Sequence, residues 1–170
     1  MIKYKNDKEY LSIINKIMNN NEFKELGNIK HHNTNRMNHS IKVSYYSYKI
    51  AKKLKLDYED VAVGGLLHDF YKDEISDCDR FKDKLLLFST KHPKDAVNNA
   101  ITNFELTEKE INIIKTHMFP MDYKVPKYAE SWLVSIVDKI LSFGEFYKKF
   151  SHKFSYSISL YMIFIINIVK

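Results

Sequence analysis

The stretch Val61-Ala62-Val63-Gly64-Gly65-Leu66-Leu67-His68-Asp69 decides how this chain folds. Its run of small and apolar residues predicts a buried segment, and an imidazole and a carboxylate follow that run directly. A buried polar group without a partner costs roughly 2–7 kcal/mol, and a buried charge costs more. Because a metal ion would turn both side chains into ligands, metal binding would remove that cost.

Further candidate ligands lie at separate points along the chain: His39, His92, His117 and Asp138. Asp138 is the clearest, because Val134 and Leu141 share its predicted helix face, where a carboxylate needs a cation or several hydrogen bonds. Alternatively, this carboxylate caps a neighbouring helix or pairs with a lysine. Each of the three histidines also allows a simpler interpretation, either as a hydrogen-bonded core residue or as an exposed residue.

The composition favours a helical protein with a single domain. The chain has 170 residues with four glycines and three prolines, which argues against a turn-rich β fold. This length is sufficient for one hydrophobic core. The single cysteine, Cys78, excludes an internal disulfide framework. The polar N-terminus shows no secretory signal, so we expect a cytoplasmic location.

The net charge of +6 has two interpretations. Positive charge would steer a phosphorylated substrate towards the protein. Scattered lysines are also typical of solvated helix faces, which is the simpler interpretation. No arginine-rich block, zinc-finger spacing or aromatic-basic motif indicates binding to a nucleic acid polymer.

Hydrophobic periodicity and capping residues predict an all-α bundle of about seven to eight helices. The first amphipathic helix covers about residues 7–20, and residues 21–34 are expected to form a loop. A helix over about 35–56 and a helix over 58–69, capped by Asp57, come next. The apolar positions expected to form the buried face of the helix over 35–56 are Val43, Tyr46, Ile50 and Leu54.

Further helices are expected over about residues 79–89, 93–104, 108–117 and 130–149. Pro93 suits a first helical turn, which would place His92 at the N-terminus of that helix. Thr107 and Glu110 match a capping box. The tail over 152–169 is strongly apolar but shorter than the ~20 residues that span a bilayer. A buried final helix is favoured over a membrane contact, and a homodimer interface is compatible with this tail.

The ordered set of candidate ligands resembles the HD domain superfamily. The stretches that carry the resemblance are Asn38-His39-Ser40, Gly64-Gly65-Leu66-Leu67-His68-Asp69-Phe70-Tyr71-Lys72, Lys91-His92-Pro93, Lys115-Thr116-His117 and Ile136-Val137-Asp138-Lys139. They cover about residues 30–150, the expected core of the domain, on which the terminal helices would pack. That superfamily consists largely of metal-dependent phosphohydrolases, and the presence of two histidines after the His-Asp pair is similar to its two-metal branches.

The resemblance implies a dinuclear metal site in which Asp69 bridges the two ions. The ligands that complete the first site would be His39, His68 and Asp138. Those that complete the second site would be His92 and His117. Imidazole and carboxylate ligands suit iron or manganese, with zinc, cobalt, nickel and magnesium as alternatives. A metal-activated hydroxide would attack the phosphorus atom of the substrate, and Asp69 would be the catalytic group that accepts the proton.

The residues expected to bind the phosphates of the substrate are Arg36, Lys72 and Lys139. Each also has a simpler interpretation as a charge that faces solvent. The expected function is hydrolysis of a phosphoester bond in a nucleotide or a related small phosphorylated compound. Two alternatives stay open at this point: a di-iron oxygenase on the same scaffold, and a non-catalytic sensor that binds a nucleotide.

Overall fold

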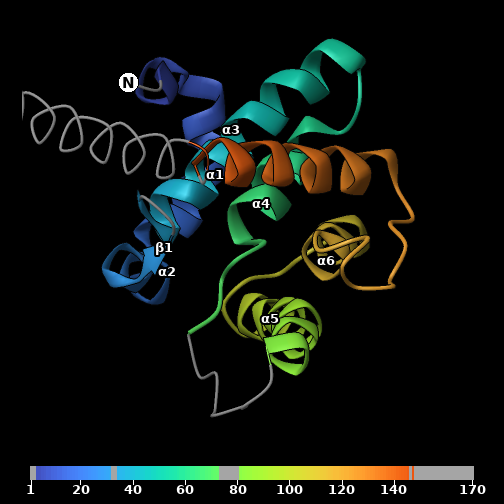
Figure 1. The fold of residues 1–170 in the computed structure, drawn as a ribbon. Helices are drawn as coiled ribbons and strands as arrows, with labels where there is room; N and C mark the ends of the chain where they lie inside the picture. Colours follow the sequence, from blue (N-terminus) through green and yellow to red (C-terminus); the bar gives the residue numbers. More distant parts are fainter. Residues whose placement is uncertain (1–2, 32–33, 73–80, 146, 148–170) are drawn as a thin grey trace, which may run out of the picture.

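The computed structural model describes residues 3–31, 34–72, 81–145 and 147, which form an all-α fold (Figure 1). The strands within these ranges form one short antiparallel ladder, in which β1, Lys30–His31, pairs with β2, Thr34–Asn35. The predicted fold class is therefore confirmed. The predicted helix over 152–169 lies outside the described residues.

The N-terminal part is more helical than the sequence indicated. Its elements are η1 Lys3–Asn6, α1 Lys8–Asn19, α2 Asn21–Glu25 and η2 Leu26–Asn28. The expected loop over 21–34 is wrong for its first half, because the Asn20 side chain caps α2 by accepting a hydrogen bond from the Phe23 N–H. Phe23 and Leu26 are buried in the main hydrophobic core, which fixes this short segment in place.

Two helices, α3 (Arg36–Leu54) and α4 (Tyr58–Leu67), form the centre of the fold. Their N-caps are Asn35 and Asp57, and Asp57 was predicted in this role. Helix α4 packs against α3 on one side and against α6 (Glu108–Thr116) on another. The predicted helix over 58–69 is two residues too long, because α4 ends at Leu67 and the next two residues form a turn.

The predicted buried face of α3 is wrong, although Val43 is buried as expected. Tyr46, Ile50 and Leu54 are 43%, 37% and 60% exposed. The helix buries small side chains instead: Ser40, Ser44, Ser47 and Ala51. The cause is close packing against α4, since a Cβ on Gly65 would lie 3.1 Å from the Ser44 Cα atom.

The other glycine of the pair makes a similar approach to α6. A Cβ atom on Gly64 would lie 2.8 Å from Ile113, which is closer than real Cβ atoms come to a neighbour. The adjacent glycines therefore let α4 lie against both neighbouring helices. This packing carries the end of α4, with His68 and Asp69, into the interior of the bundle.

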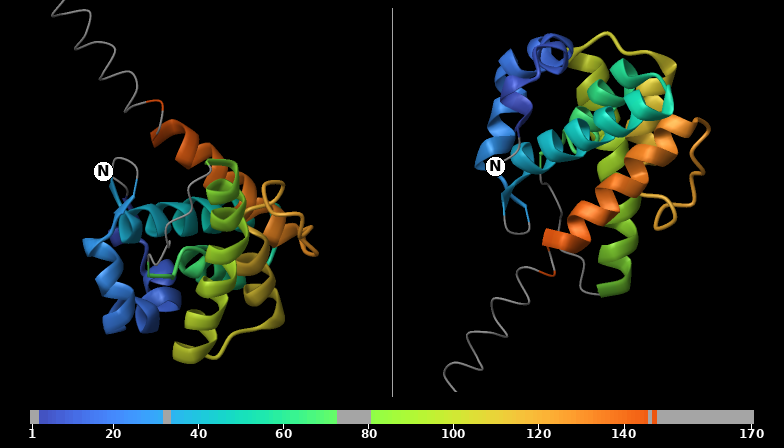
Figure 2. Two further views of the ribbon diagram at one scale, coloured as in Figure 1. Left: turned by 60° about the horizontal axis from the view of Figure 1, so that its bottom comes forward. Right: turned by 90° about the horizontal axis from the view of Figure 1, so that it is seen from above.

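The two helices expected over 79–89 and 93–104 are one helix, α5 (Phe81–Asn103), which packs against α6 (Figure 2). Pro93 lies inside α5 rather than at its start. Proline lacks the N–H that would bond to the carbonyl four residues before it, which costs about 3 kcal/mol in a helix interior. Here Pro93 itself is buried, and Ala96 and Ala100 on the following turns are fully buried, so packing offsets that cost.

Residues 129–145 form a further helix, drawn in orange in Figure 1, where the sequence predicted a helix over 130–149. One of its faces buries Val134, Val137 and Asp138. The other face carries a row of exposed apolar side chains that continues to residue 147: Trp132, Ile136, Ile140, Phe143 and Tyr147. Among the described residues, no helix has both the length and the apolar character needed to cross a bilayer.

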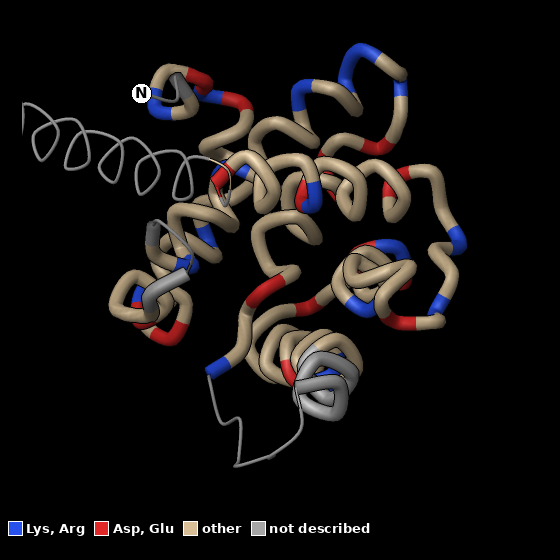
Figure 3. Tube along the Cα trace, viewed as in Figure 1, with Lys and Arg blue, Asp and Glu red and all other residues tan. Residues whose placement is uncertain are grey.

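Charged residues are interspersed over the elements rather than gathered on one helix (Figure 3). Ion pairs such as Lys49–Asp7 connect α3 with the start of α1 at the surface. This distribution favours the interpretation of the net charge as solvated helix faces.

Candidate metal centre

The predicted ligands come from separate elements and are all buried. Helix α3 supplies His39, the turn after α4 supplies His68 and Asp69, and α5 supplies the next residue in chain order, His92. His117 is the C-terminal cap of α6. Asp138 lies on the 129–145 helix, with 7% of its surface exposed. The structure thus brings together residues that are up to 99 positions apart in the sequence.

These side chains form two groups around one shared carboxylate. The members of the first group are His39, His68 and Asp69, and those of the second are Asp69, His92 and His117. Within each group, each residue offers one ligand atom, and these atoms lie within 4.8 Å of one another. Both groups therefore have the size and the atom types of a metal site.

The two oxygens of Asp69 face different groups. Its Oδ1 atom lies 3.7 Å from His92 Nε2 and 3.6 Å from His117 Nε2. Its Oδ2 atom lies 3.7 Å from His68 Nε2. A carboxylate placed in this way can bridge two ions.

Asp138 extends the first group. Its Oδ1 atom lies 2.9 Å from His39 Nε2 and 3.6 Å from His68 Nε2. Burial raises the pKa of Asp138, but the hydrogen bond from His39 and the neighbouring imidazole of His68 hold that pKa well below its usual range. The carboxylate is therefore charged in the folded protein, as a metal ligand must be.

Two of the histidines are oriented by the ends of their own helices. His68 Nδ1 donates to the Gly65 carbonyl at 2.8 Å, and His117 Nδ1 donates to the Ile114 carbonyl at 2.7 Å. The last carbonyls of a helix have no partner within it, so they are available as acceptors. Because Nδ1 is the donor to a carbonyl in each ring, Nε2 is the nitrogen that faces Asp69, at 3.7 Å for His68 and 3.6 Å for His117. Such a bond from the other ring nitrogen is the usual way in which proteins orient a metal-binding histidine.

The Nε2 atom of His68 is buried and has no hydrogen-bond partner. A nitrogen in that state costs stability unless something else satisfies it. A divalent ion would do so, and the surrounding atoms are the nitrogen and oxygen ligands that such an ion prefers. The residues present therefore fit a metal centre.

The two groups differ in their protonation when no ion is bound. Burial lowers the pKa of His117 to about 3, helped by the nearby imidazoles of His92 and His68, so its ring is neutral. Burial also lowers the pKa of His39, but hydrogen bonds to Asp138 and Glu145 outweigh it and raise that pKa to about 10. A cation at the first group would therefore displace a proton from His39.

Glu145 is a site residue that the sequence reasoning missed. Its Oε2 atom lies 3.3 Å from His39 Nδ1, and its Oε1 atom accepts a hydrogen bond from Lys42 Nζ at 2.6 Å. Burial raises the pKa of Glu145, but the bonds to His39 and Lys42 lower it to about 2. A sequence signal did exist, because Glu145 follows Asp138 by seven residues and so lies on the same helix face two turns later.

The three predicted phosphate-binding cations have different surroundings. Arg36 is buried, and it donates to the Tyr71 carbonyl at 2.6 Å and to the Tyr71 hydroxyl at 3.0 Å. Its guanidinium carbon lies 3.9 Å from the centre of the Tyr71 ring, which itself packs 5.0 Å from the ring of His92. Arg36 is thus connected to the second group through one aromatic ring.

Lys139 and Lys72 lie in contrasting positions. The Lys139 ammonium donates to the His117 carbonyl at 2.7 Å and to Ser135 Oγ at 2.9 Å, and burial lowers its pKa. Lys72 is exposed and forms an ion pair with Glu25 at 2.9 Å. The structure therefore ties Lys139 to the backbone behind the second group and leaves Lys72 at the surface.

A helical fold whose interior holds histidines around a shared aspartate defines a class of metal-binding α proteins. The sequence profile of the HD domain family matches residues 36–142, and this chain belongs to that family. The match spans all the predicted ligands, from His39 to Asp138, and it confirms the resemblance seen in the sequence. No curated protein and no solved structure matches the chain.

Proposed function

We propose that the chain is a metal-dependent phosphohydrolase that cleaves a phosphoester bond of a nucleotide or a related small phosphorylated compound. Membership of a family made up mostly of metal-dependent hydrolases supports the reaction class. The single observation that carries the proposal is the position of Asp69, whose two oxygens face two separate groups of histidines. That arrangement suits two divalent ions, with iron or manganese preferred for imidazole and carboxylate ligands.

The chain's own residues prepare the centre for these ions. His68 and His117 would hold one ion each through Nε2, because their Nδ1 protons are bonded to backbone carbonyls. Glu145 would keep His39 in the matching tautomer by accepting its Nδ1 proton. When bound, divalent ions lower the pKa of a coordinated water and neutralise charge on phosphoryl oxygens. Asp69 would then be the nearest carboxylate to accept the proton that hydrolysis releases.

The phosphate-binding roles stay proposals, and the surroundings of each cation suggest how it would act. Lys72 would contact the substrate directly, because its ammonium lies at the surface and can exchange Glu25 for a phosphate. Arg36 would act by holding Tyr71 against His92. Lys139 would fix the backbone carbonyl of His117 rather than reach the substrate.

The oxygenase and the sensor remain the alternative functions. The same ligands would serve a di-iron oxygenase, since a fold and its ligand set do not determine the reaction. Loading the protein with iron under anaerobic conditions and then adding oxygen separates these alternatives, because only an oxygenase consumes oxygen in a substrate-dependent manner. A homodimer and a cytoplasmic location also stay predictions. The apolar tail over 152–169, with which a homodimer interface was compatible, lies outside the described residues.

The direct test is turnover by the full chain loaded with manganese or iron, assayed against a panel of nucleotides and simple phosphomonoesters. We expect release of phosphate or a dephosphorylated nucleoside, and a loss of at least about 10³-fold in the Asp69→Ala variant, since that change removes the bridging carboxylate. Glu105→Ala, at an exposed loop position, is the matched control and should keep full activity. Absence of turnover on every phosphoester by metal-loaded protein would contradict the proposal.

A further inference from the structure

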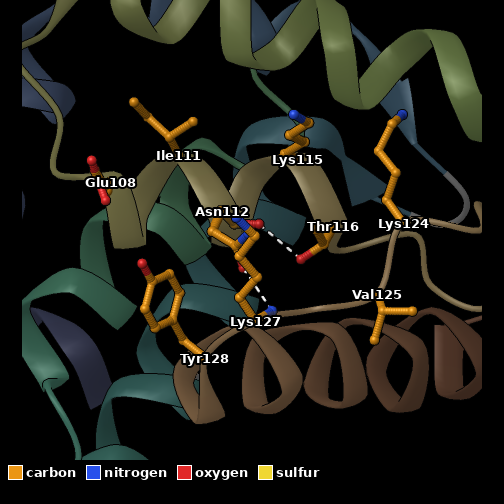
Figure 4. Close-up of a pocket in the computed structure, with 9 residues that line it drawn as sticks. All are labelled: Glu108, Ile111, Asn112, Lys115, Thr116, Lys124, Val125, Lys127 and Tyr128. Atoms are coloured by element: carbon orange, nitrogen blue, oxygen red, sulfur yellow. Dashed lines mark hydrogen bonds between the residues drawn. The ribbon is translucent and has the colours of Figure 1, made fainter.

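A second cavity lies between α6 and the segment over 124–128 (Figure 4). Its volume is about 520 Å³, which falls within the roughly 300–1,000 Å³ of typical small-molecule sites. Its lining residues are Glu108, Ile111, Asn112, Lys115, Thr116, Lys124, Val125, Lys127 and Tyr128. No predicted ligand of the metal centre is among them.

The two sites lie on different faces of α6. The residues that line the cavity are one and two helical turns apart along one face of this helix: Glu108, Ile111, Asn112, Lys115 and Thr116. Ile113, Ile114 and His117 are buried on the face that packs into the bundle. A molecule in the cavity would therefore touch the last turn of α6 from outside, while His117 points inward.

The cavity is positively charged. Among the described residues, the ammonium groups of Lys115 and Lys127 have no carboxylate within ion-pair distance, and Lys124 pairs with Asp122 at 2.8 Å. Glu108 is the one acidic residue in the lining, against three lysines. An anion would find uncompensated positive charge here.

Asn112 adds an uncharged donor at the floor of the cavity. Its Oδ1 atom accepts hydrogen bonds from the Lys127 N–H at 3.1 Å and from Ser131 Oγ at 2.9 Å. These bonds hold the 124–128 segment against α6, and they orient the amide so that its Nδ2 group is the remaining donor. In the described part of the chain, no group accepts a hydrogen bond from that Nδ2 atom. A ligand with acceptor oxygens could do so.

The two ends of the cavity differ in chemistry. Lys115 and Lys124 lie at one end, and Glu108 and Tyr128 lie at the other (Figure 4). Glu108 and Lys115 are two helical turns apart, which is about 10 Å along the axis. Ile111 and the Tyr128 ring give the acidic end apolar surface against which a planar group can pack.

We propose that this cavity is a binding site for an organic phosphate, separate from the metal centre. The phosphate would lie against Lys115 and Lys124 and accept a hydrogen bond from Asn112. The uncharged part of the ligand would pack on Ile111 and Tyr128, and its hydrogen-bond donors would face Glu108. The proposal does not depend on hydrolysis at the metal centre.

The test is calorimetric titration of the full chain with ADP, at low salt and after treatment with a chelator so that metal ions do not recruit the nucleotide. We expect one binding event in unaltered protein and a dissociation constant at least tenfold higher in the double variant Lys115→Gln, Lys124→Gln. Lys115 is exposed and Lys124 is half-buried beside Asp122, and glutamine keeps most of the side-chain length and a polar end at both positions.

The matched control is Lys16→Gln, which removes an exposed lysine from α1, a helix that does not line the cavity. It should bind ADP as the unaltered chain does. Tyr128→Leu should weaken ADP binding but leave the binding of pyrophosphate unchanged, because pyrophosphate lacks the nucleoside that would pack on the ring. Absence of ADP binding, or equal binding by the double variant and the unaltered chain, would overturn the proposal.

Discussion

Two clusters of charged side chains in the described part of the chain differ in one respect: only one of them is complete without an added ion. We call that one the cap cluster; its members are Asp57, Asp60, Lys109, Glu110 and Glu130. There the carboxylates of Asp57, Glu110 and Glu130 accept hydrogen bonds from backbone N–H groups near helix starts, and that of Asp60 accepts one from the Thr107 hydroxyl. Lys109 contacts three of the four carboxylates. At the metal centre, by contrast, the buried His68 Nε2 atom has no hydrogen-bond partner.

The difference lies in which groups surround the charges. Helix N-termini offer free N–H donors, so acidic residues placed there are satisfied by the backbone itself. The metal centre is built from the turns that end α4 and α6 and from residues within α3, α5 and the 129–145 helix, whose own N–H groups are bonded inside the helix. Buried carboxylates therefore belong to a self-sufficient structural cluster in one place and to a candidate metal centre in the other.

The largest expected effect is that of removing metal ions. Because an ion binds only the folded centre, saturation at 1,000 times the dissociation constant adds about 4 kcal/mol to the free energy of unfolding. For a chain of this size that corresponds to roughly 8–16 °C in melting temperature. Thermal unfolding followed by circular dichroism, with and without a chelator, checks this. An unchanged melting temperature would show that the centre is satisfied without ions, like the cap cluster.

The next effect concerns the residue that orients His39. Glu145→Gln should weaken metal binding by about 10–100-fold, because carboxylate partners of ligating histidines contribute that much. Competition against a chromophoric chelator measures the affinity. Lys42→Met, which removes the other partner of Glu145, should have a smaller effect in the same direction. If Glu145→Gln binds metal as tightly as the unaltered chain, Glu145 has no positioning role.

A smaller effect is expected in the cap cluster. Lys109→Met removes the cation shared by Asp57 and Glu130 and should lower the free energy of unfolding by about 1 kcal/mol. Urea unfolding of the metal-free protein measures this change. Metal content should stay the same, and a loss of metal in this variant would show that the two clusters are not independent.

A further effect expected in the cap cluster is a pH dependence of stability. The pKa of Glu110 is raised from 4.5 to about 7, chiefly by burial and to a smaller extent by the carboxylates of Asp60 and Asp57, while the hydrogen bond from the Thr107 N–H acts against this rise. Between pH 4.5 and about 7, the Glu110 carboxyl is therefore protonated in the folded state and ionised in the unfolded state. The free energy of unfolding falls as pH rises through this range. Glutamine keeps the capping bond and removes the titration.

Urea unfolding at pH 5 and pH 8 measures this comparison. The stability of Glu110→Gln relative to the unaltered chain should be higher at pH 8 than at pH 5. A difference that is the same at both pH values would contradict the raised pKa. The exposed residue Glu108 provides the control, since Glu108→Gln lies in the same helical turn.

The sequence was most informative where the chemistry itself was unusual. His68 and Asp69 stand out because an apolar run rarely ends in two polar groups, and the ordered histidines that accompany them are the ones the structure brings together. Glu145 was missed because the helix face of Asp138 was followed for one turn rather than two. Its position seven residues later was visible in the sequence.

Packing was harder to predict than chemistry. The exposed positions Tyr46, Ile50 and Leu54 are larger and more apolar than the serines that α3 buries, so hydrophobicity alone selects the wrong face. The correct face depends on how closely Gly65 approaches Ser44, which is a property of two helices together. The prediction that Pro93 starts a helix was wrong for a similar reason. The free-energy cost of a proline inside a helix is offset by tertiary contacts, which exist only in the folded bundle.

The central claim is that the paired groups around Asp69 hold two metal ions. The most direct test is elemental analysis of the full chain, purified without chelator and reconstituted with iron or manganese. The structure predicts close to two equivalents per chain in the unaltered protein and a loss of both in Asp69→Ala. No bound metal after reconstitution, or full metal content in Asp69→Ala, would contradict it.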